Sequence, residues 1–336
     1  MRCQYVTSAQ ESGATQPTGS AQHQLDSDCT GLRILAVHAH PDDESSKGAA
    51  SMAAYARRGA RVMVVSCTGG ERGSILNPGV EENRRSHWDL AGLRHREMAG
   101  AREALGVEHR WLGFMDSGLP EGDPLPPLPW GCFAKTPLER AAAPLVRIVR
   151  EFRPHVILAY DENGGYPHPD HIMAHKVAVE AWEAAGDPRR YIAEGDAWEP
   201  LKLYYDRAFD VARFKALHEA LETRGMHSPF AERIARFAES EPEGAPPVSR
   251  HQTTTRIPCA DCFDVRDQAL KSHVSQVDPD GFFFAVSNDL QREIWPYEDY
   301  VLAASRVEAN LPEYDFAEGI DYRQTPETRR GNDQTA

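Results

Sequence analysis

Short apolar runs alternate along the chain with longer amphipathic stretches. The short runs have the length and the β-branched content of buried strands: RILAVHA (33–39), RVMVVSCT (61–68), HRWLGF (109–114) and HVILAY (155–160). The longer stretches carry apolar residues at helical spacing: 45–58, 84–105, 138–152 and 171–185. This alternation predicts an α/β fold, a Rossmann-like, three-layer, mostly parallel sheet with helices on both faces.

The pattern is weaker after residue 200, where we expect an added C-terminal lobe. KLYYDRAF (202–209) is consistent with one more strand, and the aromatic run FFFAV (282–286) is expected to belong to the core. Helices are expected over 210–240 and 263–277, with a linker over 239–250. The predicted organisation is a disordered tail (1–30), a Rossmann-like core (31–205), a helical and β lobe that completes a substrate cleft (206–315), and a polar tail (316–336).

Composition and charge narrow the class of protein. With 336 residues, 41% of them hydrophobic, the chain can bury a sizeable core. A formal net charge of -14 leaves no basic face for phosphates, which argues against a nucleic-acid partner. No apolar run approaches the ~20 residues that a membrane helix needs, so no membrane partner is expected. The 6 cysteines are irregularly spaced, which favours a reducing, cytoplasmic location, and a homo-oligomer stays open.

Two loops carry the candidate chemistry. HAHPDDE follows the first predicted strand and YPHPDH follows the fourth. Because the carboxyl ends of parallel strands meet at one edge of a sheet, both loops are expected at the same site. They offer imidazoles and carboxylates suited to a divalent metal with an open coordination position: His38, His40, Asp42, Asp43, Glu44, His168, Asp170 and His171.

The spacing of these residues indicates separate roles. Asp42 and Asp43 are adjacent and cannot easily present one face to one ion, so one is expected to ligate while the other accepts a proton. Pro169 fits the first turn of a helix, which places His168 at its cap and His171 in its first turn. His168 is then free to face a substrate, with Asp170 expected to hold its ring and raise its pKa. Either loop alone is equally compatible with a capped helix start.

The same motifs resemble the LmbE-like (PIG-L) family of zinc-dependent N-deacetylases. The matching stretches span roughly residues 32–310: HAHPDDESSKGAA, TGGERGSILNP, LRHREMAGAREALGV, LGFMDSG, DENGGYPHPDH and SQVDPDGFFFAV. The resemblance implies a Rossmann-like fold, in agreement with the alternation of elements. It also implies a Zn²⁺ cofactor, although such a ligand set accepts Fe²⁺ as well.

The resemblance implies roles for individual residues. It makes His40, Asp43 and His171 the metal ligands and Asp42 the general base. It makes His168 the oxyanion-stabilising or acid group, beside Asp170, and Tyr166 a mobile residue that approaches the substrate carbonyl. Residues expected to bind substrate are Lys47, Arg94 and Asp116, with Glu71 or Arg72 of the glycine-rich loop TGGERG lining the cleft.

The implied function is hydrolysis of a linear amide in a small molecule built on glucosaminyl-inositol. Lys47 lies in SSKG, which resembles the branch that cleaves the cysteinyl amide of mycothiol S-conjugates in thiol-based detoxification. The alternatives are deacetylation of N-acetylglucosaminyl-inositol in mycothiol biosynthesis, or an amidase dedicated to one conjugate of a particular pathway. A non-catalytic protein that binds thiol conjugates is the alternative from a different class.

Two further features are expected to be structural. Cys259 and Cys262 have the spacing of a zinc knuckle, but no second pair of ligands follows at a suitable distance. His175 lies one helical turn after His171 and is expected to pack against the sheet rather than to bind metal.

Overall fold

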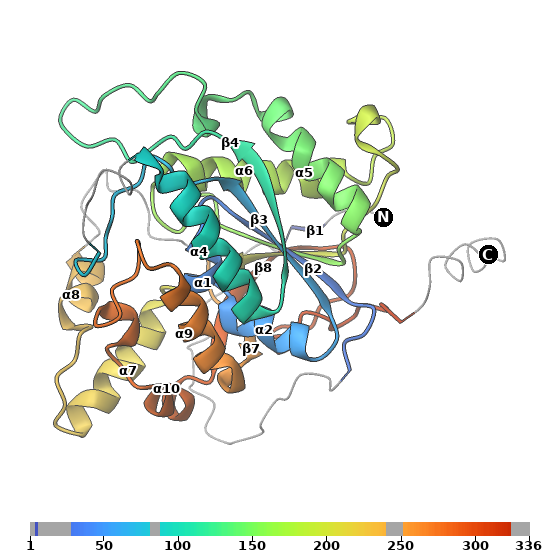
Figure 1. Ribbon diagram of the computed structural model, residues 1–336. Coiled ribbons are helices and arrows are strands. Elements are labelled where there is room, and N and C mark those ends of the chain that lie inside the picture. Colours follow the sequence, from blue (N-terminus) through green and yellow to red (C-terminus); the bar gives the residue numbers. More distant parts are fainter. Residues whose placement is uncertain (1–3, 6–27, 81–87, 240–250, 324–336) are drawn as a thin grey trace.

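The computed structural model describes residues 4–5, 28–80, 88–239 and 251–323, in which helices cover both faces of an 8-stranded sheet (Figure 1). The strands are β1 (Gln4–Tyr5), β2 (Arg33–His38), β3 (Arg61–Thr68), β4 (Glu108–Phe114), β5 (Val156–Ala159), β6 (Lys202–Asp206), β7 (Thr255–Pro258) and β8 (Tyr297–Ser305). The helices are α1 (Asp43–Ser46), α2 (Ala49–Arg57), α4 (Leu90–Leu105), α5 (Leu138–Phe152), α6 (Pro169–Ala184), α7 (Val211–Thr223), α8 (Ala231–Glu239), α9 (Phe263–Ser272) and α10 (Asn288–Ile294). The α/β fold expected from the alternation of elements is confirmed.

The strand order places a topological switch point at the centre of the sheet. The order is β1-β8-β6-β5-β2-β3-β4, with β7 paired to β8. Strands β2 to β6 are parallel, whereas β8 runs antiparallel to β6. The chain proceeds from β2 outward through β3 and β4, and then returns to β5 on the other side of β2. Ligands of such sheets bind beyond the carboxyl ends of the two strands at the reversal, here β2 and β5.

The buried strands separate two layers of the core. On β2, Ile34 and Ala36 face one cluster, which includes residues of α2, α4 and α9. Leu35 and Val37 face the other cluster, which includes residues of α5 and α6. Figure 1 shows these helices on the two faces of the sheet. Because the strand is covered on both faces, its sequence is continuously apolar rather than alternating, which is why the run RILAVH is so readily recognised.

Several predicted elements differ in extent from the observed ones. The helix expected over 45–58 is two helices, α1 and α2, separated by Lys47 and Gly48. The helix expected over 263–277 ends at Ser272. The stretch expected to be helical over 210–240 is divided into α7 and α8, and the linker predicted over 239–250 lies almost wholly outside the described residues.

The C-terminal third does more than form a lobe. Strand β8, which the sequence pattern did not reveal, enters the main sheet beside β6. A separate apolar cluster forms from α7, α10 and Phe230. The run FFFAV was expected in the core, but Phe282 to Phe284 form a short 3-10 helix whose side chains are only half-buried. Of these rings, Phe282 and Phe283 border cavities rather than the sheet.

The ends of the described chain also differ from the expected tails. Gln4 and Tyr5 form a short strand paired with β8, although the rest of 1–27 lies outside the described residues. Phe316, expected in a polar tail, is fully buried against Tyr55, Tyr204 and Tyr300. The three rings give it a stable apolar environment, so the chain stays packed past the predicted boundary. Among the described helices, none combines the length and apolar character that spanning a membrane requires.

Candidate active site

The two polar loops meet at the switch point, as the sequence predicted. His40, Asp42 and Asp43 follow β2, while His168, Asp170 and His171 lie at the start of α6, after β5. His168 caps α6 by accepting a hydrogen bond from the backbone N–H of Asp170, and Pro169 occupies the first turn. The cap sets the start of α6, which brings residues more than 120 positions apart in sequence to one edge of the sheet.

Three of these side chains turn nitrogen and oxygen atoms toward one another. Asp43 Oδ2 lies 3.5 Å from His40 Nδ1 and 3.4 Å from His171 Nε2. All three residues are buried, and these atoms form one of the groups in the described residues that could hold a metal ion. Asp43 is the carboxylate held between both imidazoles, which makes it the better placed of the two aspartates to bind a metal.

The neighbours of the imidazoles determine which ring nitrogen is available. His171 Nδ1 contacts the Gly164 carbonyl oxygen at 2.9 Å, so Nδ1 carries the proton and Nε2 keeps its lone pair. His40 Nε2 lies 3.3 Å from Asp170 Oδ2, which orients that ring with Nδ1 toward Asp43. A carboxylate or carbonyl on the far nitrogen is the usual support of a metal-binding histidine.

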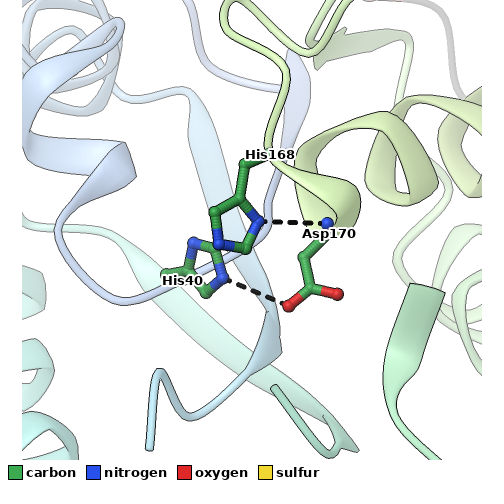
Figure 2. Close-up of side chains that lie close together, drawn as sticks. All are labelled: His40, His168 and Asp170. Atoms are coloured by element: carbon green, nitrogen blue, oxygen red, sulfur yellow. Dashed lines mark hydrogen bonds and ion pairs between the residues drawn. The ribbon is translucent and has the colours of Figure 1, made fainter. Parts of the chain in front are cut away.

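Asp170 is itself held in place by a residue of the segment that follows β4. Ser117 donates to Asp170 through its backbone N–H, at 2.8 Å, and through its hydroxyl. Figure 2 shows His40 reaching Asp170 while the His168 ring points to the Asp170 backbone nitrogen. The Asp170 carboxylate therefore supports the His40 ring. The sequence had predicted that it would hold the His168 ring.

A divalent metal fits this donor set. Two imidazoles and one carboxylate suit Zn²⁺ or Fe²⁺. His171 Nε2 is buried and finds no hydrogen-bond partner in the described part of the chain, so its lone pair is available to a metal ion. A second group, His40, His168 and Asp170, also has its ligand atoms close enough together to hold a metal ion. It fits less well because Asp170 is already bonded by Ser117 and His168 Nδ1 accepts a backbone N–H.

Asp42 occupies a strained position at the mouth of the site. Its φ of 111° is rare for a residue with a side chain. Arg94 holds it, with Nη2 3.2 Å from Asp42 Oδ2 and 2.5 Å from the Pro41 carbonyl oxygen. Burial raises the pKa of Asp42, and the Arg94 guanidinium opposes that rise. With 27% of the side chain exposed, the carboxylate can reach an incoming molecule.

His168 faces the cleft with a protonated Nε2. Its Nδ1 accepts the Asp170 backbone N–H at 3.1 Å, so the neutral ring carries its proton on Nε2. Burial, reinforced by the nearby His40, lowers the pKa of His168. Asp170 does raise the pKa of His168, as expected, but burial and the neighbouring His40 outweigh its contribution. The neutral ring still presents a hydrogen-bond donor.

A cleft of about 920 Å³ opens over these residues. Tyr166, 42% exposed, lies beside it with its ring 4.5 Å from that of His171. Residues of the glycine-rich loop and of the Pro-rich segment border the opposite side, among them Arg72, Gly73, Gly118, Leu119 and Glu121. We therefore regard this cleft, here named the catalytic cleft, as the place where a substrate meets the candidate ligands.

Most of the residues predicted to bind substrate form hydrogen bonds or ion pairs with other residues of the chain. Lys47 Nζ lies 2.6 Å from Asp43 Oδ1. Burial alone would lower the pKa of Lys47, but the Asp43 and Asp206 carboxylates raise it. Arg94 is only 3% exposed and bonds to Gly70 and Pro41 as well as Asp42. Both residues line the catalytic cleft, and contact with a substrate stays a prediction for each.

Asp116 and Glu71 form a supporting pair. Glu71 Oε1 accepts the Asp116 backbone N–H at 2.8 Å, and Glu71 does not line the catalytic cleft. Asp116 accepts the backbone N–H groups of Arg72 and Gly118 and lies 3.7 Å from His40 Nε2. Asp116 does line the cleft, so it is the better placed of the two to meet a substrate hydroxyl.

Two glycines beside the site make room for its side chains. A Cβ on Gly70, whose φ is 66°, would collide with the Arg94 guanidinium. A Cβ on Gly164, whose φ is 72°, would collide with His171. The Gly164 carbonyl is also the partner of His171 Nδ1, so this glycine both makes room for the ligand and orients it.

The structure adds Ser117 and Tyr160, which the sequence did not single out, and gives Glu44 a partner that the sequence did not reveal. Ser117 holds Asp170, and Tyr160 stacks on His171 with an interplanar angle of 11° while its hydroxyl oxygen accepts the Ala39 backbone N–H at 3.0 Å. Glu44 is buried in an ion pair with His273 of the segment after α9, at 2.7 Å. A buried Glu directly after the Asp pair indicates that a basic partner is present. Only tertiary packing identifies that partner as His273.

Other histidines and cysteines lie outside the ligand set. His38 is buried with its Nδ1 3.3 Å from the Tyr160 hydroxyl. His175 bonds to the Tyr160 carbonyl oxygen at 2.9 Å and packs on Tyr205, as predicted. Cys259 and Cys262 are buried free thiols.

Comparison with known proteins places the site in a wider context. Residues 35–182 match the family described as GlcNAc-PI de-N-acetylase (PIG-L). A mycothiol S-conjugate amidase from Streptomyces coelicolor is 53% identical over 291 residues, which cover 86% of this chain and 97% of that protein. A 1D-myo-inositol 2-acetamido-2-deoxy-alpha-D-glucopyranoside deacetylase from Geodermatophilus obscurus is 40% identical over 280 residues, 80% of this chain and 91% of that protein.

Solved structures share the fold at low identity. An N,N'-diacetylchitobiose deacetylase from Pyrococcus horikoshii has a TM-score of 0.53 at 16% identity and covers 89% of this chain and 88% of its own. The protein TT1542 from Thermus thermophilus has a TM-score of 0.52 at 20% identity, with 83% and 97% covered. At these identities the likeness concerns the arrangement of the sheet and helices alone.

Proposed function

The chain belongs to the PIG-L family of GlcNAc-PI de-N-acetylases, and we propose that it is a metal-dependent amidase of mycothiol S-conjugates. It would hydrolyse the cysteinyl-glucosaminyl amide to glucosaminyl-inositol and an N-acetylcysteine S-conjugate. The observation that carries the proposal is the site at the switch point, where His40, Asp43 and His171 converge beside Asp42 and His168. The relative that is 53% identical and named for this activity supports the choice of substrate.

The proposed cofactor is Zn²⁺, held by His40 Nδ1, Asp43 Oδ2 and His171 Nε2. Such an ion supplies Lewis acidity to an amide carbonyl and lowers the pKa of water toward neutrality. The ligands are supported from behind by Asp170 and Gly164, which fix the ring nitrogens. Fe²⁺ would be accepted by the same donor set.

The side chains of the chain itself handle the protons and the developing charge. Asp42 accepts a proton from the attacking water and returns it to the amine as the C–N bond breaks. His168 donates its Nε2–H to the oxygen that becomes negative in the tetrahedral transition state, a role that the neutral ring can perform. Tyr166 lies beside His168 and His171, where its hydroxyl can reach the same substrate oxygen. Arg94 keeps the Asp42 carboxylate aimed into the cleft.

Deacetylation of N-acetylglucosaminyl-inositol is the second candidate, because relatives at 36 to 40% identity are named as such deacetylases. Both reactions break an amide on the same sugar and need the same ligands and base. They differ in the acyl group, which is an acetyl in one and a substituted cysteinyl in the other.

A direct comparison of substrates tests the proposal. The zinc-loaded protein is given an S-alkylated mycothiol and N-acetylglucosaminyl-inositol, and kcat/KM is measured for each. We expect a clear preference for the conjugate. A preference for the acetyl compound would instead assign the protein to mycothiol biosynthesis. Tight binding of the conjugate without cleavage of either compound would indicate a binding protein.

A further inference from the structure

A second cavity adjoins the catalytic cleft and shares part of its wall. Ser46, Phe209, Leu270 and Phe283 line both spaces. The second cavity has a volume of about 70 Å³, room for roughly five water molecules. We name it the aromatic cavity, after the apolar side chains that distinguish it: Phe209, Phe214, Leu217, Phe230, Phe282 and Phe283.

The rings of the aromatic cavity are arranged in pairs. Phe214 stacks on Phe230 with 5.2 Å between centroids, and Phe282 stands edge-on to Phe230 at 5.7 Å. The Arg233 guanidinium covers Phe282 at 4.2 Å. Figure 1 shows α7, α8 and α10 grouped beyond the edge of the sheet, so these rings lie outside both sheet-facing layers of the core. Such walls accept a flat apolar group by stacking or edge contact.

The remaining wall of the aromatic cavity is polar and incompletely satisfied. Arg213 Nε and Asp206 Oδ2 are buried and have no hydrogen-bond partner among the residues that the structure describes. A void left by loose packing of a core is lined by apolar atoms. The polar side of this cavity also includes Arg266, Glu298 and Asp299, so an apolar wall faces convergent polar groups, a combination found in ligand sites.

The aromatic cavity opens close to the reacting centre. Lys47 Nζ lies 2.6 Å from Asp43 Oδ1 and 5.9 Å from the centroid of the Phe209 ring. One lysine head group therefore separates a proposed metal ligand from the first ring of the cavity. In a cysteinyl amide the sulfur is three bonds from the scissile carbonyl carbon, so a group on that sulfur must lie just beside the metal site.

We propose that the aromatic cavity is the subsite for the S-linked substituent and that it selects a single aromatic or similarly compact apolar ring. This inference rests on the proposed amidase function and specifies its substrate class. The sugar and inositol occupy the catalytic cleft, and the thioether directs its substituent past Phe209 into the cavity. Burial of a ring there strengthens binding of the acyl portion relative to a methyl group.

Two conjugates and two variants test the assignment. S-methyl and S-benzyl mycothiol are compared with the wild-type protein, with Leu217→Phe, which fills the cavity, and with Leu221→Phe. Leu221 is buried on the same helix and in the same apolar cluster but does not line the cavity, so this variant controls for crowding. We expect wild type to prefer the benzyl conjugate by about tenfold or more in kcat/KM.

The variants separate the subsite from a structural effect. Leu217→Phe is expected to lower kcat/KM for the benzyl conjugate far more than for the methyl conjugate and so to remove most of the benzyl preference, whereas Leu221→Phe is expected to keep the preference. Equal efficiency with both conjugates, unaffected by Leu217→Phe, would overturn the subsite but leave the amidase function standing. Failure to hydrolyse either conjugate would overturn the proposed function.

Product binding gives a second measurement that does not depend on a variant that folds. Calorimetry on the wild-type protein compares N-acetyl-S-benzylcysteine with N-acetyl-S-methylcysteine. At least tenfold tighter binding of the benzyl compound is expected. Equal affinities, in the presence of measurable binding, would contradict the subsite.

Discussion

At the scale of single residues, the site separates two adjacent aspartates by their surroundings. Asp43 is buried between His40 and His171 and paired with Lys47. Asp42 is partly exposed and held by Arg94 in a left-handed conformation. Strain of this kind persists where surrounding contacts enforce it and is concentrated at functional sites. Because both residues are aspartates, it is this difference in exposure and partners that supports the proposal of Asp43 as ligand and Asp42 as base.

The role of Asp42 can be tested by Asp42→Asn. Asparagine is among the residues that tolerate a positive φ, so the variant keeps the loop while losing the proton acceptor. We expect kcat to fall by about 10²- to 10⁴-fold, with zinc stoichiometry unchanged. Turnover near the wild-type rate would remove Asp42 from the role of base.

Ser117 is expected to act on the metal through Asp170 and His40. Ser117→Ala removes one of the two donors to the Asp170 carboxylate, and loss of such a supporting contact weakens metal binding by about 10- to 100-fold. Ser275→Ala is the matched control, since the Ser275 hydroxyl is also buried and bonds a carboxylate, that of Glu97. Competition with a chelator measures both affinities, and an equal loss in the control would indicate general destabilisation.

At the scale of elements, β8 connects the C-terminal segments to the catalytic sheet. It pairs with β6, β7 and β1, and its Asp299 lines the aromatic cavity. The Asp299 carboxylate accepts the Trp295 indole N–H at 2.7 Å and lies near Arg256. Even so, burial, with Asp210 nearby, raises the pKa of Asp299 from 3.8 to about 6.

This raised pKa predicts a dependence of stability on pH. Below pH 3.8 the carboxyl is protonated in both states, and above pH 6 it is ionised in both, at a cost to the folded state. Stability is therefore lost as pH rises through this window, by at most about 3 kcal/mol from a shift of about two pKa units. Urea unfolding of the metal-free Asp299→Asn variant should show that its stability relative to wild type improves by up to this amount between pH 4 and pH 8. A constant difference across that range would contradict the raised pKa.

At the scale of the whole molecule, the metal site joins distant parts of the chain. Its ligands come from the ends of two neighbouring strands, and its supports come from the segment after β4 and, through Glu44 and His273, from the segment after α9. A metal that binds only the folded chain therefore stabilises the entire fold, not one loop.

Removal of the metal should affect activity and stability together. Chelation is expected to abolish hydrolysis and to lower the Tm, and zinc at 100 times its Kd should restore about 2.7 kcal/mol of stability. His171→Ala should lose this response, whereas His175→Ala, in the same helix but outside the ligand set, should keep it. Calorimetry with zinc titration measures both, and an unchanged response in His171→Ala would refute the ligand assignment.

The sequence by itself determined the parallel α/β core and the edge of the sheet where the candidate ligands lie. Continuous apolar runs mark strands covered on both faces, and the motifs HAHPDDE and PHPDH end two of them, so the edge of the sheet was predictable. Only the tertiary structure decided that Asp170 supports His40, that Lys47 pairs with Asp43, and that β8 completes the sheet. These contacts join residues whose meeting depends on side-chain direction and on the packing of separate elements, which local pattern does not encode.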